Sequence, residues 1–276
     1  MKSDKVIAVR GLQTRQGRRK TGRFLVEGPQ AVTSAVAAGI PIHELFVEED
    51  AGGSFSSVIV EAEASGARVS LVTAPVMAAM AQTQTPQGLL AVCALLPEGD
   101  LDALMAGDGV VVVLEAIADP GNVGTVIRTA DAVGAAGVVL TPDTADVHSG
   151  KVVRSTAGSL FHLPVLSGRV IEEVAAAAHA HGRAVAVLGG EYATDLFTAI
   201  DDGSVSGRTV WVVGNEAHGA SPEARSAADL TVRIPMSGRA ESLNAAVAAA
   251  AVLYVSAYAA ARDSQEPSSD GVGAPA

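Results

Sequence analysis

Cysteine, aromatic residues and long apolar runs are scarce in this sequence of 276 residues. The one cysteine, Cys93, has no partner for an internal disulfide and cannot build a thiolate metal site alone. No uninterrupted apolar run reaches the roughly 18 residues of a membrane span, and the N-terminal segment lacks the apolar core of a signal peptide. These absences predict a soluble, cytoplasmic protein with no membrane partner.

Two common nucleotide-binding motifs are also missing. The glycines fit neither the G-x-G-x-x-G dinucleotide fingerprint nor the phosphate loop of P-loop enzymes. A dinucleotide-dependent dehydrogenase and a P-loop nucleotidase are therefore disfavoured.

Basic residues are outnumbered, 19 to 30, and they are unevenly spread. Residues 1–23 hold eight of the basic side chains and one acid, so the rest of the chain carries 11 basic and 29 acidic residues. An acidic body repels nucleic acid at long range, whereas a basic N-terminal segment attracts it locally. The segment is either a solvated, fraying end or a nucleic-acid contact.

The apolar content of 49% is typical of a globular chain, and its pattern indicates two α/β units. Short strands and helices alternate over residues 1–96, which we expect to be a small domain. A polar stretch, 97–108, is the expected linker, and the composition of 263–276 is typical of a disordered tail.

Residues 109–262 alternate strands and helices more regularly. Near-continuous Val and Leu strands, as in 109–114, predict a parallel sheet covered on both faces. Further strands are expected at 137–140, 163–166, 184–188, 209–213 and 232–234, and a long helix at 243–261. Ligands of such sheets bind at the carboxyl ends of the strands, so the loops there hold the candidate site.

Three such loops contain polar residues suited to chemistry. In the first, residues 114–135, Asn122 opens a helix that carries Arg128. A structural interpretation makes Asn122 the N-cap and pairs Arg128 with Asp131 on the helix surface. In the second, residues 211–221, a strand ends at Gly214 and the acid Glu216 follows.

The third loop, residues 234–255, leads through Ser242 and Asn244 into the last helix. Either residue is a plausible N-cap, and either could instead face a ligand at the helix N-terminus.

In this order and spacing, the three segments resemble the SpoU/TrmH family of S-adenosylmethionine-dependent RNA 2′-O-ribose methyltransferases. The match covers about residues 109–260. The segments Gly22 to Gly28 and Thr85 to Val92, with Arg18, are similar to the RNA substrate-binding domain often fused to that family.

The resemblance implies a fold and a cofactor. Residues 109–262 would form a C-terminal trefoil-knotted, parallel-sheet methyltransferase domain, preceded by a small α/β RNA-binding domain. S-adenosylmethionine would lie in the knot, with the family's binding positions falling on Gly214, Ile234 and Leu243. A glycine and two aliphatic residues also suit an apolar slot for adenine.

The resemblance further implies which residues act. Arg128 would handle the ribose 2′-hydroxyl, with support from Asn122, Glu216, Ser242 and Asn244. As a general base Arg128 is awkward, because a guanidinium stays protonated in proteins. A clamp on the adjacent phosphate that also stabilises the developing alkoxide is the preferred role.

Family membership implies partners as well. We expect a homodimer through the C-terminal domain and RNA contacts in the N-terminal domain, with rRNA favoured over tRNA. Alternatives are a non-catalytic RNA-binding protein and a small-molecule enzyme with a parallel α/β fold. The expected RNA-binding side chains are Arg15, Arg18, Arg19, Lys20 and Arg23.

Two positions depart from the family pattern. The third loop has Gly238-Arg239-Ala240 without a bulky apolar residue, and Ala217 follows Glu216 where many relatives have glycine. Neither change removes an expected catalytic group, and we expect both to affect loop shape and substrate choice.

Overall fold

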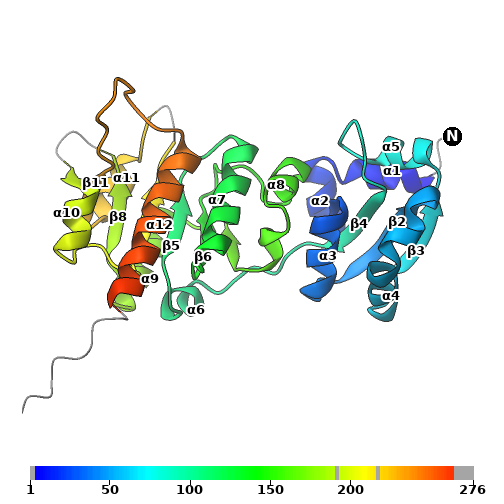
Figure 1. The fold of residues 1–276 in the computed structure, drawn as a ribbon, viewed down its shortest axis with the longest axis horizontal. Helices are drawn as coiled ribbons and strands as arrows, with labels where there is room; N and C mark the ends of the chain where they lie inside the picture. Colours follow the sequence, from blue (N-terminus) through cyan, green and yellow to red (C-terminus); the bar gives the residue numbers. More distant parts are fainter. Residues whose placement is uncertain (1–3, 190–192, 216–217, 264–276) are drawn as a thin grey trace, which may run out of the picture.

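A computed structural model describes residues 4–189, 193–215 and 218–263. Its strands form two separate sheets, a four-stranded one near the N-terminus and a seven-stranded one after it. Figure 1 shows the two units side by side along the long axis of the molecule.

The N-terminal sheet has the order β1-β4-β2-β3. Strands β1 and β2 are antiparallel to β4, whereas β3 is parallel to β2. The elements are α1 (Asp4–Gly11), α2 (Arg15–Thr21), β1 (Arg23–Glu27), α3 (Pro29–Ala37), β2 (Ile42–Glu48), the 3₁₀ helix η1 (Glu49–Phe55), α4 (Ser56–Ala64), β3 (Arg68–Val72), α5 (Ala74–Met80) and β4 (Leu89–Ala94).

The basic N-terminal segment is folded into this unit. Val6 and Val9 of α1 are buried with Met77 and Met80 of α5 against one face of the sheet. Helix α2 is capped at its start by Thr14, whose hydroxyl accepts from the N–H of Gly17, and at its end by the left-handed Gly22. A fraying end is therefore wrong for residues 4–21, because apolar side chains between the charges anchor the segment.

The C-terminal sheet has the order β7-β6-β5-β10-β8-β11-β9, and every pairing in it is parallel. Its elements are α6 (Leu101–Ala106), β5 (Val111–Leu114), α7 (Pro120–Ala132), β6 (Gly137–Leu140), α8 (Gly150–Ser155), the 3₁₀ helix η2 (Ser159–Phe161), β7 (Val165–Ser167), α9 (Ile171–Ala180), β8 (Val185–Leu188), β9 (Thr194–Asp195), α10 (Leu196–Asp201), β10 (Val210–Val213), α11 (Pro222–Ala227), β11 (Leu230–Arg233) and α12 (Ala245–Asp263).

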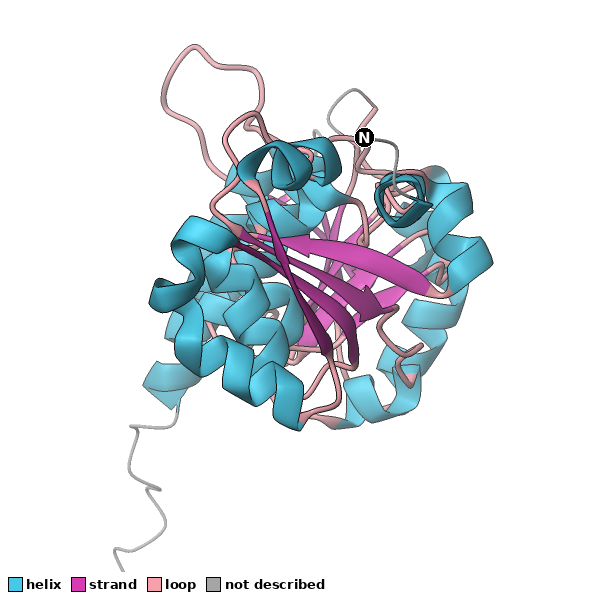
Figure 2. Cartoon of the chain, turned by 90° about the vertical axis from the view of Figure 1, so that its right-hand side faces the viewer, coloured by secondary structure: helices cyan, strands magenta, loops and turns pink. Residues whose placement is uncertain are grey.

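Helices cover both faces of this sheet, as the apolar strands predict. Alternate residues of β5 show the arrangement: Val112 and Leu114 face the core under α7, α10 and α12, whereas Val111 and Val113 face the core under α6, α9 and α11. Figure 2, which views the molecule from the N-terminal end, shows strands in the middle of the molecule and helices around them. The expected parallel sheet is confirmed, and the threading of a trefoil knot stays a prediction.

The last helix is long and apolar enough, by length and composition, to cross a membrane. In this fold α12 packs against α7, α10 and β10, and Figure 1 shows it next to α7. Ala249, Val252 and Leu253 are fully buried there. One side of α12 is thus a core helix of the C-terminal unit.

The expected linker, 97–108, contains a helix of its own. Leu104 and Met105 of α6 are buried in the core of the C-terminal sheet. Arg183, only 1% exposed, donates to the carbonyl oxygens of Met105 and Gly109 and so fixes the segment that leads into β5. The boundaries 1–96 and 109–262 stay a proposal, with most of the segment between them packed on the second unit.

Candidate functional site

A pocket of about 500 Å³ opens at the carboxyl ends of β8, β10 and β11. The loop before α12 and the first turn of that helix close its other side. Gly214, Ile234 and Leu243, the three expected cofactor positions, all line it, and so does Ser242. Residues from two separate loops of the sequence therefore meet in one cavity.

Gly214 is required by the chain itself. A Cβ atom there would lie 2.3 Å from the backbone N of Ala220, because the loop after β10 turns back against the strand end. The turn is closed by the N–H of Gly219, which donates to the carbonyl of Asn215 at 2.7 Å. The close approach expected at Gly214 is thus made by the chain's own backbone at one side of the pocket.

The pocket has an apolar lining that is open to solvent. Met236 is 39% exposed and Leu243 is 36% exposed, and both line the cavity together with the half-buried Ile234. Large apolar side chains left open at a concave site are typical of a ligand pocket.

Helix α7 follows β5, the strand that pairs with β10 at this pocket. Its N-cap is Asp119, whose carboxylate accepts from the N–H groups of Gly121 and Asn122, and Pro120 takes the first helical position. These two backbone hydrogen bonds, and then Lys151 at 3.6 Å, hold the pKa of Asp119 below its usual value. Asn122 is therefore not the N-cap of α7.

The side chain of Asn122 takes part in a contact between the first and third loops. The Nδ2 of Asn244 donates to the Oδ1 of Asn122 at 3.1 Å, across 122 residues of sequence. The Oδ1 of Asn244 accepts from the N–H groups of Ala246 and Val247, so this side chain is also the cap of α12. The structural interpretation of Asn244 as a helix cap is confirmed, and its catalytic role stays a prediction.

Arg128 lies on the exposed side of α7, two turns beyond Asn122. In the described part of the chain, it forms no hydrogen bond or ion pair. Asp131, its expected surface partner, instead contacts His162 at 2.8 Å. The guanidinium thus keeps its full donor capacity for a ligand.

Family models match nearly the whole chain. Residues 109–254, more than half of it, match the SpoU rRNA Methylase family, and residues 3–91 match the MRM3-like substrate binding domain. The chain belongs to the SpoU rRNA methylase family.

Curated relatives of this SpoU methylase cover most of its length. It is 35% identical over 92% of its length to the 23S rRNA (guanosine(2553)-2′-O)-methyltransferase RlmP of Bacillus subtilis, and this covers 96% of that protein. It is also 35% identical over 88% of its length to the 23S rRNA (uridine(2479)-2′-O)-methyltransferase of Streptomyces viridochromogenes, covering 85% of that protein.

Solved structures agree with the SpoU fold. An AdoMet-bound rRNA methyltransferase from Sinorhizobium meliloti has a TM-score of 0.83 at 29% identity, with 97% of each chain covered. AviRb from Streptomyces viridochromogenes, in complex with AdoMet, has a TM-score of 0.80 at 29% identity, with 95% of this chain and all of that chain covered.

Ser242 and Glu216 complete the expected set of this SpoU methylase. Ser242 is exposed and lines the pocket two residues before the Asn244 cap. Glu216, together with Ala217, lies outside the described residues. Its flanking residue Asn215 donates from Nδ2 to the carbonyl of Ala116, which ties the loop after β10 to the end of β5.

The five expected RNA-binding cations do not form one cluster. Arg15 and Arg19 are exposed on α2 and line a cavity between the two units, and Lys20 is exposed on the same helix. Arg23, at the start of β1, is close enough to His43 to affect its pKa, which is lowered first by burial and then by Arg23.

Arg18 differs from the expectation of a surface phosphate contact. It is 4% exposed, donates to the carbonyl of Leu12, and pairs with Asp146 of the C-terminal unit at 2.5 Å. Burial alone would raise the pKa of Asp146, but the hydrogen bonds from Arg18 and from the N–H of His148 outweigh it and lower that pKa. Arg18 therefore joins the two units.

Four features of this site were not predicted from the sequence. Met236 and Gly189 line the pocket, and a glycine directly after a strand was the available signal for Gly189. Glu115, 8% exposed, accepts from the hydroxyl and the N–H of Ser221 at 2.5 and 3.0 Å. Ala116 has a positive φ of 54°, a conformation that Asn215 and Thr141 hold from either side by hydrogen bonds.

Proposed function

We propose that this SpoU methylase transfers a methyl group from S-adenosylmethionine to a ribose 2′-oxygen of rRNA. The observation that carries the proposal is the hydrogen bond between Asn122 and Asn244. It joins the start of the helix bearing Arg128 to the start of the helix that lines the pocket, so nucleophile and donor can be handled at one place.

The pocket suits the cofactor by its lining. Leu243, Met236 and Ile234 offer an apolar slot for adenine, and the strand ends at Leu188 and Val213 leave backbone groups to read its edge. S-adenosylmethionine supplies an electrophilic methyl group on a sulfonium sulfur. The protein's share of the work is to orient the ribose hydroxyl and to stabilise the charge that develops on it.

Arg128 performs the electrostatic part. Its guanidinium stays protonated, so it donates hydrogen bonds to the phosphate next to the target ribose and to the developing alkoxide. The hydroxyl proton passes to that phosphate or to water. Asn122 and Asn244, already bonded to each other, fix the first turns of α7 and α12 around the reacting atoms.

The names of the relatives support rRNA as the substrate, with tRNA as the alternative. The two relatives described above are named for 23S rRNA, and for different nucleotides of it, so the target nucleotide does not follow from the likeness. An rRNA substrate supports the expected cytoplasmic location.

A homodimer through the C-terminal unit forms part of the proposal. Val247, Tyr254 and Tyr258 of α12 are 53%, 57% and 66% exposed. They recur at spacings of seven and four residues, so they share the side of α12 that its own unit leaves uncovered. A second copy is the occupant that the family resemblance favours.

A methyl-transfer assay separates the alternatives. Purified full-length protein is incubated with tritiated S-adenosylmethionine and, in separate reactions, with unmodified 23S rRNA, unmodified 16S rRNA and tRNA. We expect label in 23S rRNA. Label in tRNA alone would replace the substrate, and cofactor binding without label in any RNA would favour a non-catalytic RNA-binding protein.

A further inference from the structure

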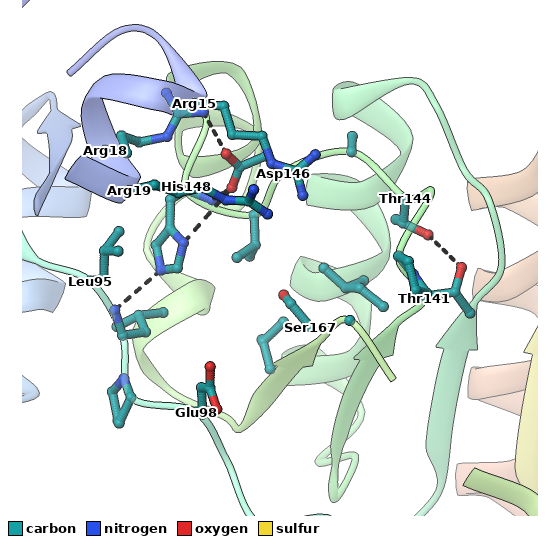
Figure 3. Close-up of a pocket in the computed structure, with 18 residues that line it drawn as sticks. Arg15, Arg18, Arg19, Leu95, Glu98, Thr141, Thr144, Asp146, His148 and Ser167 are labelled. Atoms are coloured by element: carbon teal, nitrogen blue, oxygen red, sulfur yellow. Dashed lines mark hydrogen bonds and ion pairs between the residues drawn. The ribbon is translucent and has the colours of Figure 1, made fainter. Parts of the chain in front are cut away.

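A second cavity, of about 440 Å³, lies between the two units (Figure 3). One wall is α2 of the N-terminal unit. The other wall is the carboxyl ends of β6 and β7, where Thr141 and Ser167 lie, and the connecting residues 95–98 form the floor. This interdomain pocket is separate from the cofactor pocket at β8, β10 and β11.

Its N-terminal wall carries more positive charge than the chain neutralises. Arg15 and Arg19 are one helical turn apart, and both extend from α2 toward the C-terminal unit in Figure 3. Neither forms an ion pair within the described residues. Arg18 between them is balanced by Asp146, and Glu98 is the one other acid that lines the pocket among the described residues.

The arginine cluster also lacks hydrogen-bond acceptors. The Nε of Arg18 is buried and has no partner in the described chain, although the rest of its guanidinium is bonded to Leu12, Gln13 and Asp146. A buried donor without an acceptor costs free energy. Three guanidiniums within five residues, with one close carboxylate, are arranged for an anion that the chain does not supply.

The opposite wall adds polar groups and no further charge. The hydroxyl of Ser167 is exposed and points into the pocket. Burial lowers the pKa of His148 to about 4, so its ring is neutral at pH 7, and its Nε2 accepts from the N–H of Leu96. A bound anion therefore meets arginines on one side and, on the other, the Ser167 hydroxyl and an uncharged imidazole.

The pocket is connected to the cofactor pocket along the sheet edge. A third cavity lies between them, sharing Thr141 and Pro142 with the interdomain pocket and Asn215 and Gly219 with the cofactor pocket. A polynucleotide bound at one end of these three cavities can extend to the other end, whereas a free anion occupies one site only.

We propose that the interdomain pocket binds a backbone phosphate of the RNA substrate, through Arg15 and Arg19, at a distance from the nucleotide that is methylated. This inference rests on the proposed function. Because residues of both units line the pocket, RNA binding there depends on the relative position of the two units as well as on α2. It goes beyond a general basic surface, since Lys20 and Arg23 lie outside the pocket lining.

The test measures binding of the full-length protein to purified 23S rRNA over a series of salt concentrations. The double variant Arg15→Gln/Arg19→Gln should weaken binding by about tenfold or more and reduce the slope of log K against log salt by about 1. Arg15→Lys/Arg19→Lys should recover part of the loss. Glu98→Gln should tighten binding, because it removes the acid that faces the phosphate.

Arg10→Gln is the matched control, since Arg10 is exposed on α1 and does not line the pocket. It should change affinity less than about twofold. If the double variant behaves like Arg10→Gln, the proposal is overturned.

Titration with inorganic phosphate distinguishes a free anion from RNA. Tight phosphate binding that the double variant abolishes, with 23S rRNA binding unchanged, would make the pocket a free-anion site and overturn the assignment to RNA. Methyl transfer by the wild-type protein is scored separately. If the wild-type protein methylates RNA but the double variant binds RNA as tightly as the wild type, this inference alone is wrong. If the double variant loses RNA binding but the wild-type protein transfers no methyl group to RNA, the proposed function alone is wrong.

Discussion

At the scale of single residues, the decisive feature is that neighbouring residues perform the structural tasks that were the alternative expectation for Asn122 and Arg128. Asp119, and not Asn122, caps α7. Asp131 contacts His162, and not Arg128. Sequence alone suggested both functional residues but assigned them the structural partners as alternatives. Local spacing could not decide between these, because the competing partner His162 lies 31 residues from Asp131.

Arg128→Ala tests the charge-stabilising role. We expect methyl transfer to fall by roughly 10²–10³-fold, the typical cost of removing one such donor, with unchanged affinity for S-adenosylmethionine in calorimetry. Thr125→Ala, one turn earlier on the exposed side of α7, is the control and should retain transfer. Near-normal turnover by Arg128→Ala would remove this residue from the mechanism.

Asn244→Asp tests the contact between the two loops apart from the helix cap. Aspartate keeps the oxygen that accepts from Ala246 and Val247 but loses the Nδ2 donor to Asn122. We expect unfolding by urea to change little and methyl transfer to drop by about tenfold, the upper end of the net contribution of one hydrogen bond between neutral groups. Asn244→Ala should lose both stability and transfer.

Should Asn244→Asp retain wild-type transfer, the hydrogen bond to Asn122 would be dispensable and the proposed alignment of α7 with α12 would fail.

At the scale of elements, close packing fixes where α7 lies, and hence where Asn122 and Arg128 are. A Cβ at Gly124 would lie 2.4 Å from the Cβ of Ser155 and 2.9 Å from the carbonyl oxygen of Val152, so α7 and α8 touch at this glycine. The sequence predicted six strands of this unit, because buried parallel strands are nearly all Val and Leu, but it did not predict β9, α10 or α11. It did not predict α2 as a packed helix, since its seven residues are mostly charged.

Gly124→Ala should destabilise the protein by about 1–3 kcal/mol, because overpacking exceeds the helix-propensity gain of about 1 kcal/mol. The free energy of unfolding in urea measures this. Gly11→Ala, also in a helix but with open space around its Cβ, is the matched control and should be neutral or slightly stabilising. Equal effects of the two substitutions would show that α7 and α8 can move apart freely.

At the scale of the whole molecule, contacts that no local pattern encodes set the relation of the two units. Arg18 and Asp146 are 128 residues apart, and Glu27 and Arg154, whose Nη1 lies 3.4 Å from a Glu27 oxygen, are 127 residues apart. From sequence Arg18 was grouped with its basic neighbours, because charge is visible there and burial is not. The shared pocket between the units escaped prediction for the same reason.

The junction should weaken in mild acid because of His148. Its pKa is about 4 in the folded protein against 6.5 ordinarily, so between these values the unfolded chain takes up a proton that the folded chain does not. Stability is therefore fully present above pH 6.5 and falls as pH approaches 4, by up to about 3 kcal/mol. Asp146, whose pKa is lowered, adds a loss at still lower pH.

The variant His148→Gln keeps an acceptor for the N–H of Leu96 and removes the titrating ring. Its free energy of unfolding should vary less between pH 6.5 and 4 than that of the wild type. The control His218→Gln removes an exposed histidine and should leave the pH profile as it was. A His148→Gln profile as steep as that of the wild type would assign the acid sensitivity to other groups.

Assembly into a dimer also belongs to this scale. Tyr254→Glu/Tyr258→Glu places two charges on the exposed apolar side of α12, and we expect the dimer to dissociate in sedimentation velocity experiments. Glu223→Gln on α11, away from α12, is the control. A wild-type protein that sediments as a monomer at every concentration would contradict the proposed assembly.

The most direct measurement of the central claim is nucleotide-resolution mapping of ribose methylation after unmodified 23S rRNA is incubated with the protein and S-adenosylmethionine. We predict one 2′-O-methylated nucleotide, seen as a single phosphodiester that resists alkaline cleavage, and we expect it to be absent with Arg128→Ala. Methylation of a base, or RNA that stays fully cleavable although the cofactor binds, would contradict it.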